Sequence, residues 1–276
     1  MHWRAVAQWM LRSKIRAAVL TALAIILLAA VLGPVVSPYG VTAISVGERF
    51  LPPSLRHPFG TDDFGRDIFT RVTAGARLSL LISCSVLAVT LVVGLVVGLV
   101  AGFFGGLVDL VLMRITDLFL AFPYLVLAMA IAGSFGPSLF STILALSVTW
   151  WASYARLVRA KILEVREQEY VQAAHAVGMS SLRVLVRHCL PNALGPIVVR
   201  GTNDLGTIML ASTILGFVGL GPQEPSPEWG RMVSKASGFL GNFWWYSFFS
   251  GLAIFVTVLT LALLGDELYE SYRHRG

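Results

Sequence analysis

The sequence predicts an all-α, polytopic membrane protein. Of its 276 residues, 56% are hydrophobic and only 13% are charged, and the mean hydropathy is +0.76. Uncharged runs of 18 or more residues recur, and a helix that rises about 1.5 Å per residue crosses a hydrocarbon core of about 30 Å in about 20 residues. A soluble domain does not combine so few charges with such runs. The chain is therefore expected to cross the membrane several times.

Counting the uncharged stretches gives six transmembrane helices. The stretch between Asp117 and Arg156 is long enough for two of them, and residues 133–137, Gly-Ser-Phe-Gly-Pro, mark a turn near its middle. This stretch is therefore predicted to form a helical hairpin. The other predicted spans are residues 17–36, 78–108, about 197–218 and about 244–265.

Basic residues predict which segments face the cytoplasm. Residues 1–16 contain Arg4 and Arg12 without any acidic residue, and the connection over residues 156–196 is also rich in arginine. Both are expected to be cytoplasmic, as is the tail over residues 266–276, whereas the loop over residues 37–77 is expected outside. The net charge of +6 largely restates this cytoplasmic excess and requires no nucleic acid. A cleaved signal peptide is the competing interpretation of the N-terminus, but its apolar stretch is longer than the usual ~7–15 residues.

The second span carries glycines at a four-residue spacing. Such a spacing lines one helix face with hydrogen atoms and lets another helix approach closely. We predict a packing interface there, within the bundle or toward a second membrane subunit. Its members are Gly94, Gly98, Gly102 and Gly106.

Residues 169–192 form a polar insert that is predicted to fold as two short amphipathic helices. Gly178 ends the first helix, Ser180 or Ser181 caps the second, and Pro191 ends the second. Such a pair of helices offers a docking surface to a soluble partner, although similar pairs occur in ordinary loops. The first helix has Tyr170, Ala173, Ala174 and Val177 on its apolar face with Glu169 and Gln172 elsewhere, and the second has Leu182, Leu185, Val186 and Cys189 with Arg183 and Arg187 opposite.

The insert resembles the cytoplasmic signature of ABC importer permeases. That pattern is Glu-Ala-Ala, three residues, Gly, nine residues, Ile, one residue and Leu-Pro. Here it is matched by Gln172-Ala173-Ala174, Gly178 and Leu190-Pro191, with Gln172 in place of Glu and His188 in the Ile position. The residues that the resemblance assigns to the ATPase contact are Glu169, Tyr170, Gln172, Ala173, Ala174, Val177, Gly178, Arg183, Arg187, Leu190 and Pro191.

Further motifs narrow the resemblance and extend it over nearly the whole chain. Residues 57–67 look like the Gly-Thr-Asp-x-x-Gly-Arg-Asp stretch of the second permease subunit of dipeptide, oligopeptide and nickel importers. The remaining matches are Arg114 and Asp117 with residues 121–123, then residues 217–221, residues 225–230, and Gly265-Asp266.

The resemblance implies a type I ABC importer permease bundle in a prokaryotic cell membrane, with a cytoplasmic pair of coupling helices. It also implies a homologous second permease, two ABC ATPase subunits and an extracytoplasmic solute-binding protein as partners. The sequence independently indicates that another subunit must hydrolyse the ATP. No Gly-x-x-x-x-Gly-Lys-Ser/Thr phosphate-binding loop is present, and Lys14, Lys161 and Lys235 lack the required glycines. We therefore expect no cofactor on this chain, with ATP and Mg on the partner subunits.

The loop before the second span contains three nearby aspartates. A calcium loop needs acids at alternate positions and a distal Glu that is absent here, so no metal site is predicted. Instead, Asp67 should cap an interfacial helix with Ile68, Phe69, Val72 and Ala76 on its apolar face, and Arg71 should pair one turn on. Together with the segment 225–230, this loop is expected to shape the face that meets the second permease or the binding protein, the alternative being simple loop rigidity. The residues concerned are Asp62, Gly65, Arg66, Asp67, Pro227, Trp229 and Gly230.

The fifth span contains Arg200 and Asp204, four residues apart. A lone charge in mid-membrane costs about 2.5–3.5 kcal/mol on insertion scales, so the two either satisfy each other or face water. We interpret Asn203 and Asp204 as lining the translocation pathway, together with Ser212; a structural ion pair is the alternative. Relatives often carry an acid at the position of Ser212, so this pathway is expected to be less polar than usual.

Other functional classes lack their sequence features. An ion-coupled secondary transporter would need its own coupling-ion site, usually within inverted repeats, and no repeat is evident. A membrane enzyme would need a nucleophile or metal motif, and neither His-Glu-x-x-His nor Gly-x-Ser-x-Gly is present. Cys84 and Cys189 lie in different parts of the predicted topology, so no disulfide is expected. Short peptides are the predicted solute, with nickel or another small solute left open.

Overall fold

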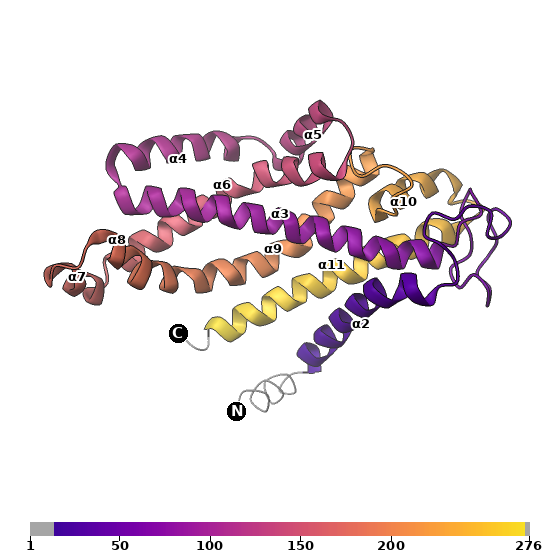
Figure 1. Ribbon diagram of the computed structural model, residues 1–276, viewed down its shortest axis with the longest axis horizontal. Coiled ribbons are helices and arrows are strands. Elements are labelled where there is room, and N and C mark those ends of the chain that lie inside the picture. The colour runs from indigo at the N-terminus through magenta and orange to yellow at the C-terminus, as the bar shows by residue number, and fades with distance from the viewer. Residues whose placement is uncertain (1–13, 274–276) are drawn as a thin grey trace.

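The computed structural model describes residues 14–273, which form a bundle of long helices (Figure 1). Arg4 and Arg12, most of the predicted tail 1–16 and the last residues of the tail 266–276 lie outside the described residues. Among the described residues the only β feature is an isolated bridge between Thr61 and Asp67. Loops and the short helix α10 gather at one end of the bundle, which we call the loop end, and α7 and α8 project from the other, which we call the insert end (Figure 1).

The first two long helices are α2 (Lys14–Val36) and α3 (Ile68–Phe104). The boundary predicted at residue 78 is wrong, because α3 runs without a break from Ile68. The interfacial helix expected before it is the first part of α3 itself. Gly75 lies within this helix. Glycine is required there because an added Cβ would come within 2.6 Å of the Trp229 ring nitrogen.

The chain turns sharply after α3 and returns as a bent pair of helices. Gly105 and Gly106 both have positive φ, and α4 (Gly106–Ala121) begins there rather than near Asp117 as predicted. After Pro123 the chain continues as α5 (Tyr124–Phe135), at 90° to α4. The predicted turn at residues 133–137 is confirmed, because α5 ends at its centre.

The remaining helices carry the insert and the second half of the bundle. The helix α3 packs most extensively on α6, and α9 packs most extensively on α11. The elements are α6 (Leu139–Arg166), α7 (Glu169–Ala176), α8 (Ser181–Val184), the π-helix η1 (Leu185–Cys189), α9 (Leu190–Val218), α10 (Trp229–Ala236), the 3₁₀-helix η2 (Ser237–Phe239) and α11 (Trp244–Arg273).

Within the described residues, three helices, α2, α3 and α11, are long and apolar enough to span a membrane, and the bent pair α4 and α5 counts as a fourth if it crosses as one span. The inner helices α6 and α9 are more polar but contain 28 and 29 residues, about 42 Å of helix at about 1.5 Å per residue. Their buried positions include serine, threonine and glycine, as expected for helices that pack mainly against protein. The predicted total of six is reached when α6 and α9 are counted by length.

The glycines of α3 pack against α6. A Cβ added to Gly94 would lie 2.5 Å from the Tyr154 Cβ, and one added to Gly98 would lie 2.5 Å from the Val158 Cβ. Gly102 lies one turn further, against Ile162. Gly106 does not belong to this interface, since it lies in the turn after α3 and an added Cβ would meet nothing within 4 Å. The packing interface is therefore inside this chain and is one turn shorter than predicted.

Candidate functional site

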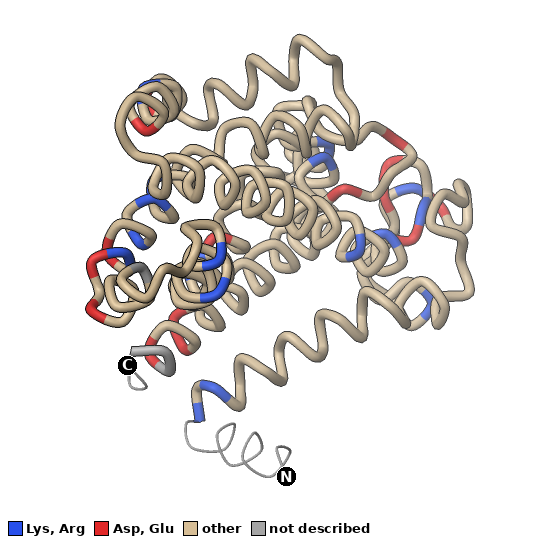
Figure 2. The backbone as a smooth tube through the Cα atoms, turned by 60° about the vertical axis from the view of Figure 1, so that its left-hand side comes forward, with Lys and Arg blue, Asp and Glu red and all other residues tan. Residues whose placement is uncertain are grey.

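The end of α11 and the start of α2 both lie away from the loop end, on the side of the bundle toward the insert (Figure 1). An ion pair between Arg16 and Glu267, with 2.7 Å between nitrogen and oxygen, joins those two helix ends. Most charged residues lie toward the two ends of the molecule, and its middle is largely uncharged (Figure 2). This distribution suits a bundle that crosses a membrane and keeps its ends in water.

The apolar face of α7 is divided between the bundle and the surface. Val171 and Ala174 are buried, at 0% and 7% exposure, and pack with residues of α6 and η1. Tyr170 and Val177 are 46% and 81% exposed, and Ala173 is exposed beside them. The sequence pattern placed Ala174 on the same face as the exposed residues and did not single out Val171. An apolar surface therefore remains open on the outer side of α7.

Gly178 ends the first helix, as predicted. Its φ is +81°, and the Met179 N–H donates to the Ala174 carbonyl oxygen at 3.1 Å, a bond that closes the C-terminal turn. An added Cβ at Gly178 would meet nothing within 4 Å, so the backbone conformation and not lack of space requires glycine. Ser180 occupies the N-cap position of α8, although its side chain makes no capping hydrogen bond.

The second helix does not end at Pro191 as predicted. The chain stays helical from Ser181 through α8, η1 and α9. Pro191 lies in the first turn of α9, directly after the π-helix, where the wider π turn and the free first positions of an α-helix tolerate a residue without an N–H. The second helix of the insert is therefore continuous with α9.

The outer side of the second helix is apolar and basic. Leu182 and Val186 are 67% and 55% exposed, whereas Cys189 on the inner side is 1% exposed. Glu169, Gln172, Arg183 and Arg187 are also exposed, and Leu190 is half-buried. An open groove of about 650 Å³ is lined by Ser180, Leu182, Arg183, Val186 and Arg187.

The predicted pathway residues of α9 are engaged inside the chain. Asp204 accepts hydrogen bonds at the same Oδ2 atom from the Tyr154 hydroxyl at 2.7 Å and from Arg200 Nε at 3.1 Å. Asn203 packs against Gly265 of α11, where an added Cβ would lie 1.7 Å from its Oδ1 atom. Ser212 is 2% exposed and donates to the Met209 carbonyl oxygen at 2.8 Å. The ion pair considered as the alternative is therefore present, and Ser212 faces no open space.

Arg200 is the more exposed of the two charged residues of α9. It was predicted only as a partner of Asp204. Its side chain is 50% exposed, against 14% for Asp204. It lies between two cavities, of about 420 Å³ and about 360 Å³, that also share Leu157. The larger cavity is lined by Leu157 and Lys161 of α6, by Pro196, Val199, Arg200 and Asn203 of α9, and by Tyr269 of α11.

At the loop end a buried ionic network centres on Asp62 and Arg66. Asp62 is 1% exposed and accepts from the Arg66 backbone N–H at 2.9 Å and from Arg66 Nε at 2.6 Å. Arg66 also donates to Glu224 at 3.0 Å, and Lys235 lies 2.7 Å from the other oxygen of Glu224. Burial raises the pKa of Glu224, but the hydrogen bonds from Lys235 and Arg66 outweigh it and leave that pKa below its usual range. Sequence reasoning missed Glu224 and Lys235, because no local pattern links them to Arg66.

Asp67 caps α3 as predicted, accepting from the Thr70 N–H at 2.8 Å. The predicted pairing of Arg71 with Asp67 is wrong. The other oxygen of Asp67 lies 2.9 Å from His57 Nδ1, while Arg71 Nε lies 3.7 Å from an Asp62 oxygen. Among residues 14–273 no group of three or more His, Cys, Asp and Glu side chains is placed to hold a metal ion.

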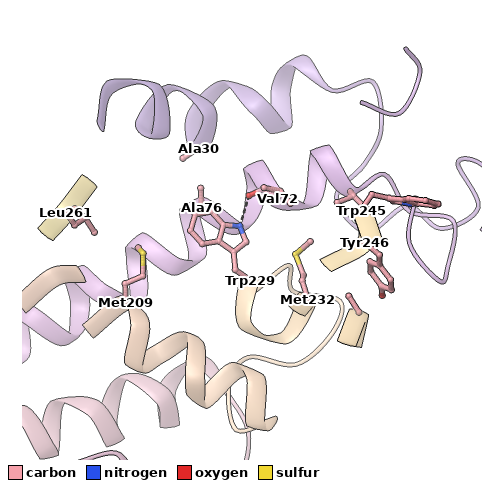
Figure 3. Packing of buried hydrophobic residues seen from close by; sticks show 11 residues of the cluster. Ala30, Val72, Ala76, Met209, Trp229, Met232, Trp245, Tyr246 and Leu261 are labelled. Carbon is pink, nitrogen blue, oxygen red and sulfur yellow. Dashed lines mark hydrogen bonds between the residues drawn. The ribbon is translucent and has the colours of Figure 1, made fainter. Parts of the chain in front are cut away.

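The segment after α9 packs onto α3 and α9. Trp229 is 2% exposed, and its ring nitrogen donates to the Val72 carbonyl oxygen at 2.8 Å beside Ala76 (Figure 3). A Cβ added to Gly230 would lie 2.1 Å from the Thr213 carbonyl oxygen. The residues predicted for the extracytoplasmic face therefore shape the loop end from inside and, Pro227 apart, are buried within it. Buried are Asp62, Gly65, Arg66, Asp67, Trp229 and Gly230, and half-buried is Pro227.

Glu228 is a further buried acid at the loop end, and it was not among the predicted site residues. It is 1% exposed and caps α10, accepting from the Gly230 N–H at 2.9 Å and the Arg231 N–H at 2.7 Å. Burial raises the pKa of Glu228 from its ordinary value of 4.5 to about 7 despite these bonds. This carboxyl group therefore changes charge near neutral pH.

Comparison with known sequences supports a transport role. The model of a family described as binding-protein-dependent transport system inner membrane component matches residues 94–275. The chain is 39% identical to the dipeptide transport system permease protein DppC of Alkalihalophilus pseudofirmus, over 98% of this chain and 88% of that protein. It is 40% identical to the probable D,D-dipeptide transport system permease protein DdpC of Escherichia coli, over 94% of this chain and 88% of that protein.

Comparison with solved structures shows the fold. A methionine ABC transporter in an inward-facing conformation, MetNI, superposes with a TM-score of 0.60 at 20% identity, over 74% of this chain and 97% of that chain. An amino acid ABC transporter crystallised with histidines superposes with a TM-score of 0.58 at 18% identity, over 74% and 94% of the two chains. The predicted fold class, an all-α type I ABC importer permease bundle, is confirmed.

Proposed function

Because this chain belongs to the binding-protein-dependent transport system inner membrane component family, we propose that it is a permease subunit of an ATP-driven ABC importer of short peptides. It forms half of the translocation pathway, and a homologous second permease forms the other half. Short peptides are the solute class because the relatives at 39% and 40% identity are named as dipeptide permeases. Nickel or another small solute carried by the same machinery is the alternative.

The observation that carries the proposal is the divided surface of the insert. Its inner residues, such as Val171 and Cys189, are buried in the bundle, while Val177 and Leu182 remain 81% and 67% exposed. Apolar side chains exposed beside Arg183 and Arg187 suit a protein partner better than water or lipid. We assign this surface to one of two ABC ATPase subunits, and the other ATPase binds the second permease. The two ATPases bind the ATP and Mg for which this chain has no sequence motif.

The arrangement of the helix ends supports the orientation that the basic residues predict. The start of α2 and the end of α11 lie away from the loop end, on the side toward the insert (Figure 1), and the Arg16 pair with Glu267 joins these two helix ends. We place this end and both termini in the cytoplasm of a prokaryotic cell whose membrane the chain crosses several times. The loop end then faces an extracytoplasmic solute-binding protein that delivers the peptide.

Reconstitution tests the proposal. Proteoliposomes that contain this chain, its second permease and the two ATPases should take up radiolabelled Ala-Ala only when the binding protein and ATP are both supplied. Vesicles with this chain alone should be inert, with or without ATP. Uptake by this chain alone along an ion gradient would identify a secondary transporter, and nickel uptake without peptide uptake would identify the alternative cargo.

A further inference from the structure

The larger of the two cavities beside Arg200 has the form of a ligand site. Its volume of about 420 Å³ lies within the range of about 300–1,000 Å³ that small-molecule pockets occupy. Leu157, Pro196 and Val199 give it apolar walls, and a few polar groups converge on it. Such a combination of apolar walls and a small number of polar groups is typical of sites that bind and orient a solute.

The charges that line this cavity are positive. Lys161 and Arg200 are the charged residues among those that line it, and no acidic residue lines it. Asp204 and Glu164 neutralise these two cations in part, through Arg200 Nε and Lys161 Nζ. Half of the Arg200 side chain nevertheless remains exposed, so its guanidinium group retains donors for a ligand.

The position of Arg200 also argues for a ligand. It lies ten residues into α9 and about three residues into the predicted fifth span, so it stands just inside the membrane boundary at the insert end. Arginines within membrane helices face water-filled cavities or partners, and Arg200 faces the cavity. The second cavity shares Arg200 and Leu157 and is also lined by Arg156, which pairs with Asp117 of α4, so the basic side chains at the two cavities come from α6 and α9.

We propose that the cavity between α6, α9 and α11 binds the terminal carboxylate of the transported peptide, and that Arg200 is the group that binds it. This inference rests on the proposed function and specifies the chemistry of the pathway. A carboxylate fits because a guanidinium donates to it in a planar, paired geometry. Asp204, held by Tyr154, then positions Arg200 and does not contact the solute.

The test measures binding without the binding protein, whose own selectivity would hide that of the permease. Val199→Cys places a thiol in the cavity wall. Cys84→Ala and Cys189→Ala remove the two native thiols of this chain. The complete importer is studied in phosphatidylcholine nanodiscs. Ala-Ala and N-acetyl-Ala-Ala should slow labelling of this thiol by N-ethylmaleimide, and Ala-Ala amide should not. Arg200→Gln should weaken the protection by about tenfold or more, the size of one charge-assisted hydrogen bond. Arg200→Lys should retain part of it, and the exposed control Arg114→Gln should retain all of it.

Three outcomes would overturn the proposal. The first is equal protection by Ala-Ala and its amide, and the second is protection that survives Arg200→Gln. The third is a labelling rate that falls when phosphatidylglycerol is added to the phosphatidylcholine nanodiscs, whether or not peptide is present, since a lipid headgroup would then occupy the cavity. If Arg200→Gln fails to assemble, the comparison of acid with amide in the Val199→Cys protein still decides. Binding-protein-dependent uptake by the same preparation tests the proposed function separately, so the two failures are distinguishable.

Discussion

At the loop end, Arg66 is 4% exposed and bonded to both Asp62 and Glu224, whereas at the insert end Arg183 and Arg187 are exposed on the outer side of the helix. Arginine is thus bonded to acidic residues of the same chain in one region and exposed in the other. Apolar side chains follow the same division, since Trp229 is 2% exposed and Val177 is 81% exposed.

The difference shows which surface needs a partner. Polar groups in the loop end satisfy each other across segments distant in sequence, so this region can hold its shape before any other protein arrives. The insert buries only its inner side and presents apolar and basic groups outward, the surface that we assign to a soluble partner. Substitutions at the loop end and at the insert end test this division.

The largest effect is expected from breaking the loop-end network. Arg66→Met leaves Asp62 buried at 1% exposure without its main partner, and removing one member of a buried ion pair costs about 3–5 kcal/mol. Thermal unfolding of the purified protein should shift sharply downward. Arg56→Met, at an exposed position of the same loop, is the matched control and should change little. Equal shifts for the two variants would show that the loop end is not held by its ionic network.

The pH dependence of stability sharpens the account of the same region. Because the pKa of Glu228 is raised from 4.5 to about 7 in the folded protein, its contribution to stability is full below pH 4.5 and is lost as pH rises through 7. The loss is about 3 kcal/mol, at about 1.36 kcal/mol per pKa unit. Glu228→Gln should remove this slope in unfolding measured across that range.

Glu224 provides the control in the same segment. Its pKa is lowered when folded, so its contribution is present above the ordinary pKa of 4.5 and is lost as pH falls. Glu224→Gln should therefore change the pH slope in the opposite direction from Glu228→Gln. Slopes of the same sign would contradict the assigned environments of the two carboxyl groups.

Sequence patterns predicted those features that depend on neighbours along the chain. The Asp67 cap, the end of α7 at Gly178 and the turn between α5 and α6 each follow from a residue type at a local position. Periodicity also identified amphipathic faces in the insert, but it could not tell that Ala174 turns inward while Tyr170 turns outward. That choice depends on how the insert meets α6.

Long-range contacts account for the rest. Arg66 and Glu224 are 158 positions apart, and only the packing of α10 against α9 and α3 brings their segments together. Pro191 suggested a helix end because a local rule cannot foresee the π-helix before it. Gly106 fits the four-residue spacing, but Gly105 and Gly106 together turn the chain and remove it from the interface.

At the insert end, Gly178→Val should separate transport from ATP hydrolysis. The φ of +81° costs an L-residue about 1–2 kcal/mol, and a β-branched side chain adopts it least readily. The turn between α7 and α8 should distort while the bundle stays folded, so peptide uptake per ATP hydrolysed should fall. Gly178→Asn is the matched control, because asparagine tolerates this conformation and should retain most coupling. Normal uptake by the valine variant would count heavily against assigning the ATPase contact to the insert.

The smallest effect is expected where α2 meets α3. It tests whether polar groups also satisfy each other within the chain outside the loop end. Pro34 has no N–H, so the Ala30 carbonyl oxygen lacks its helical donor, and Arg77 donates to that oxygen and to the Val31 carbonyl oxygen. Arg77→Met should cost about 1 kcal/mol of stability, the scale of hydrogen bonds between membrane helices.

A double-mutant cycle isolates this pairing. In Pro34→Ala the new N–H at position 34 satisfies the Ala30 oxygen, so Arg77→Met should then cost less than it does in the unaltered chain. Thermal unfolding of the four proteins gives the coupling energy, with Arg114→Met, whose side chain is 77% exposed, as the control. A coupling energy of zero would mean that the contribution of Arg77 does not depend on the N–H that Pro34 lacks, which would contradict the pairing proposed between α2 and α3.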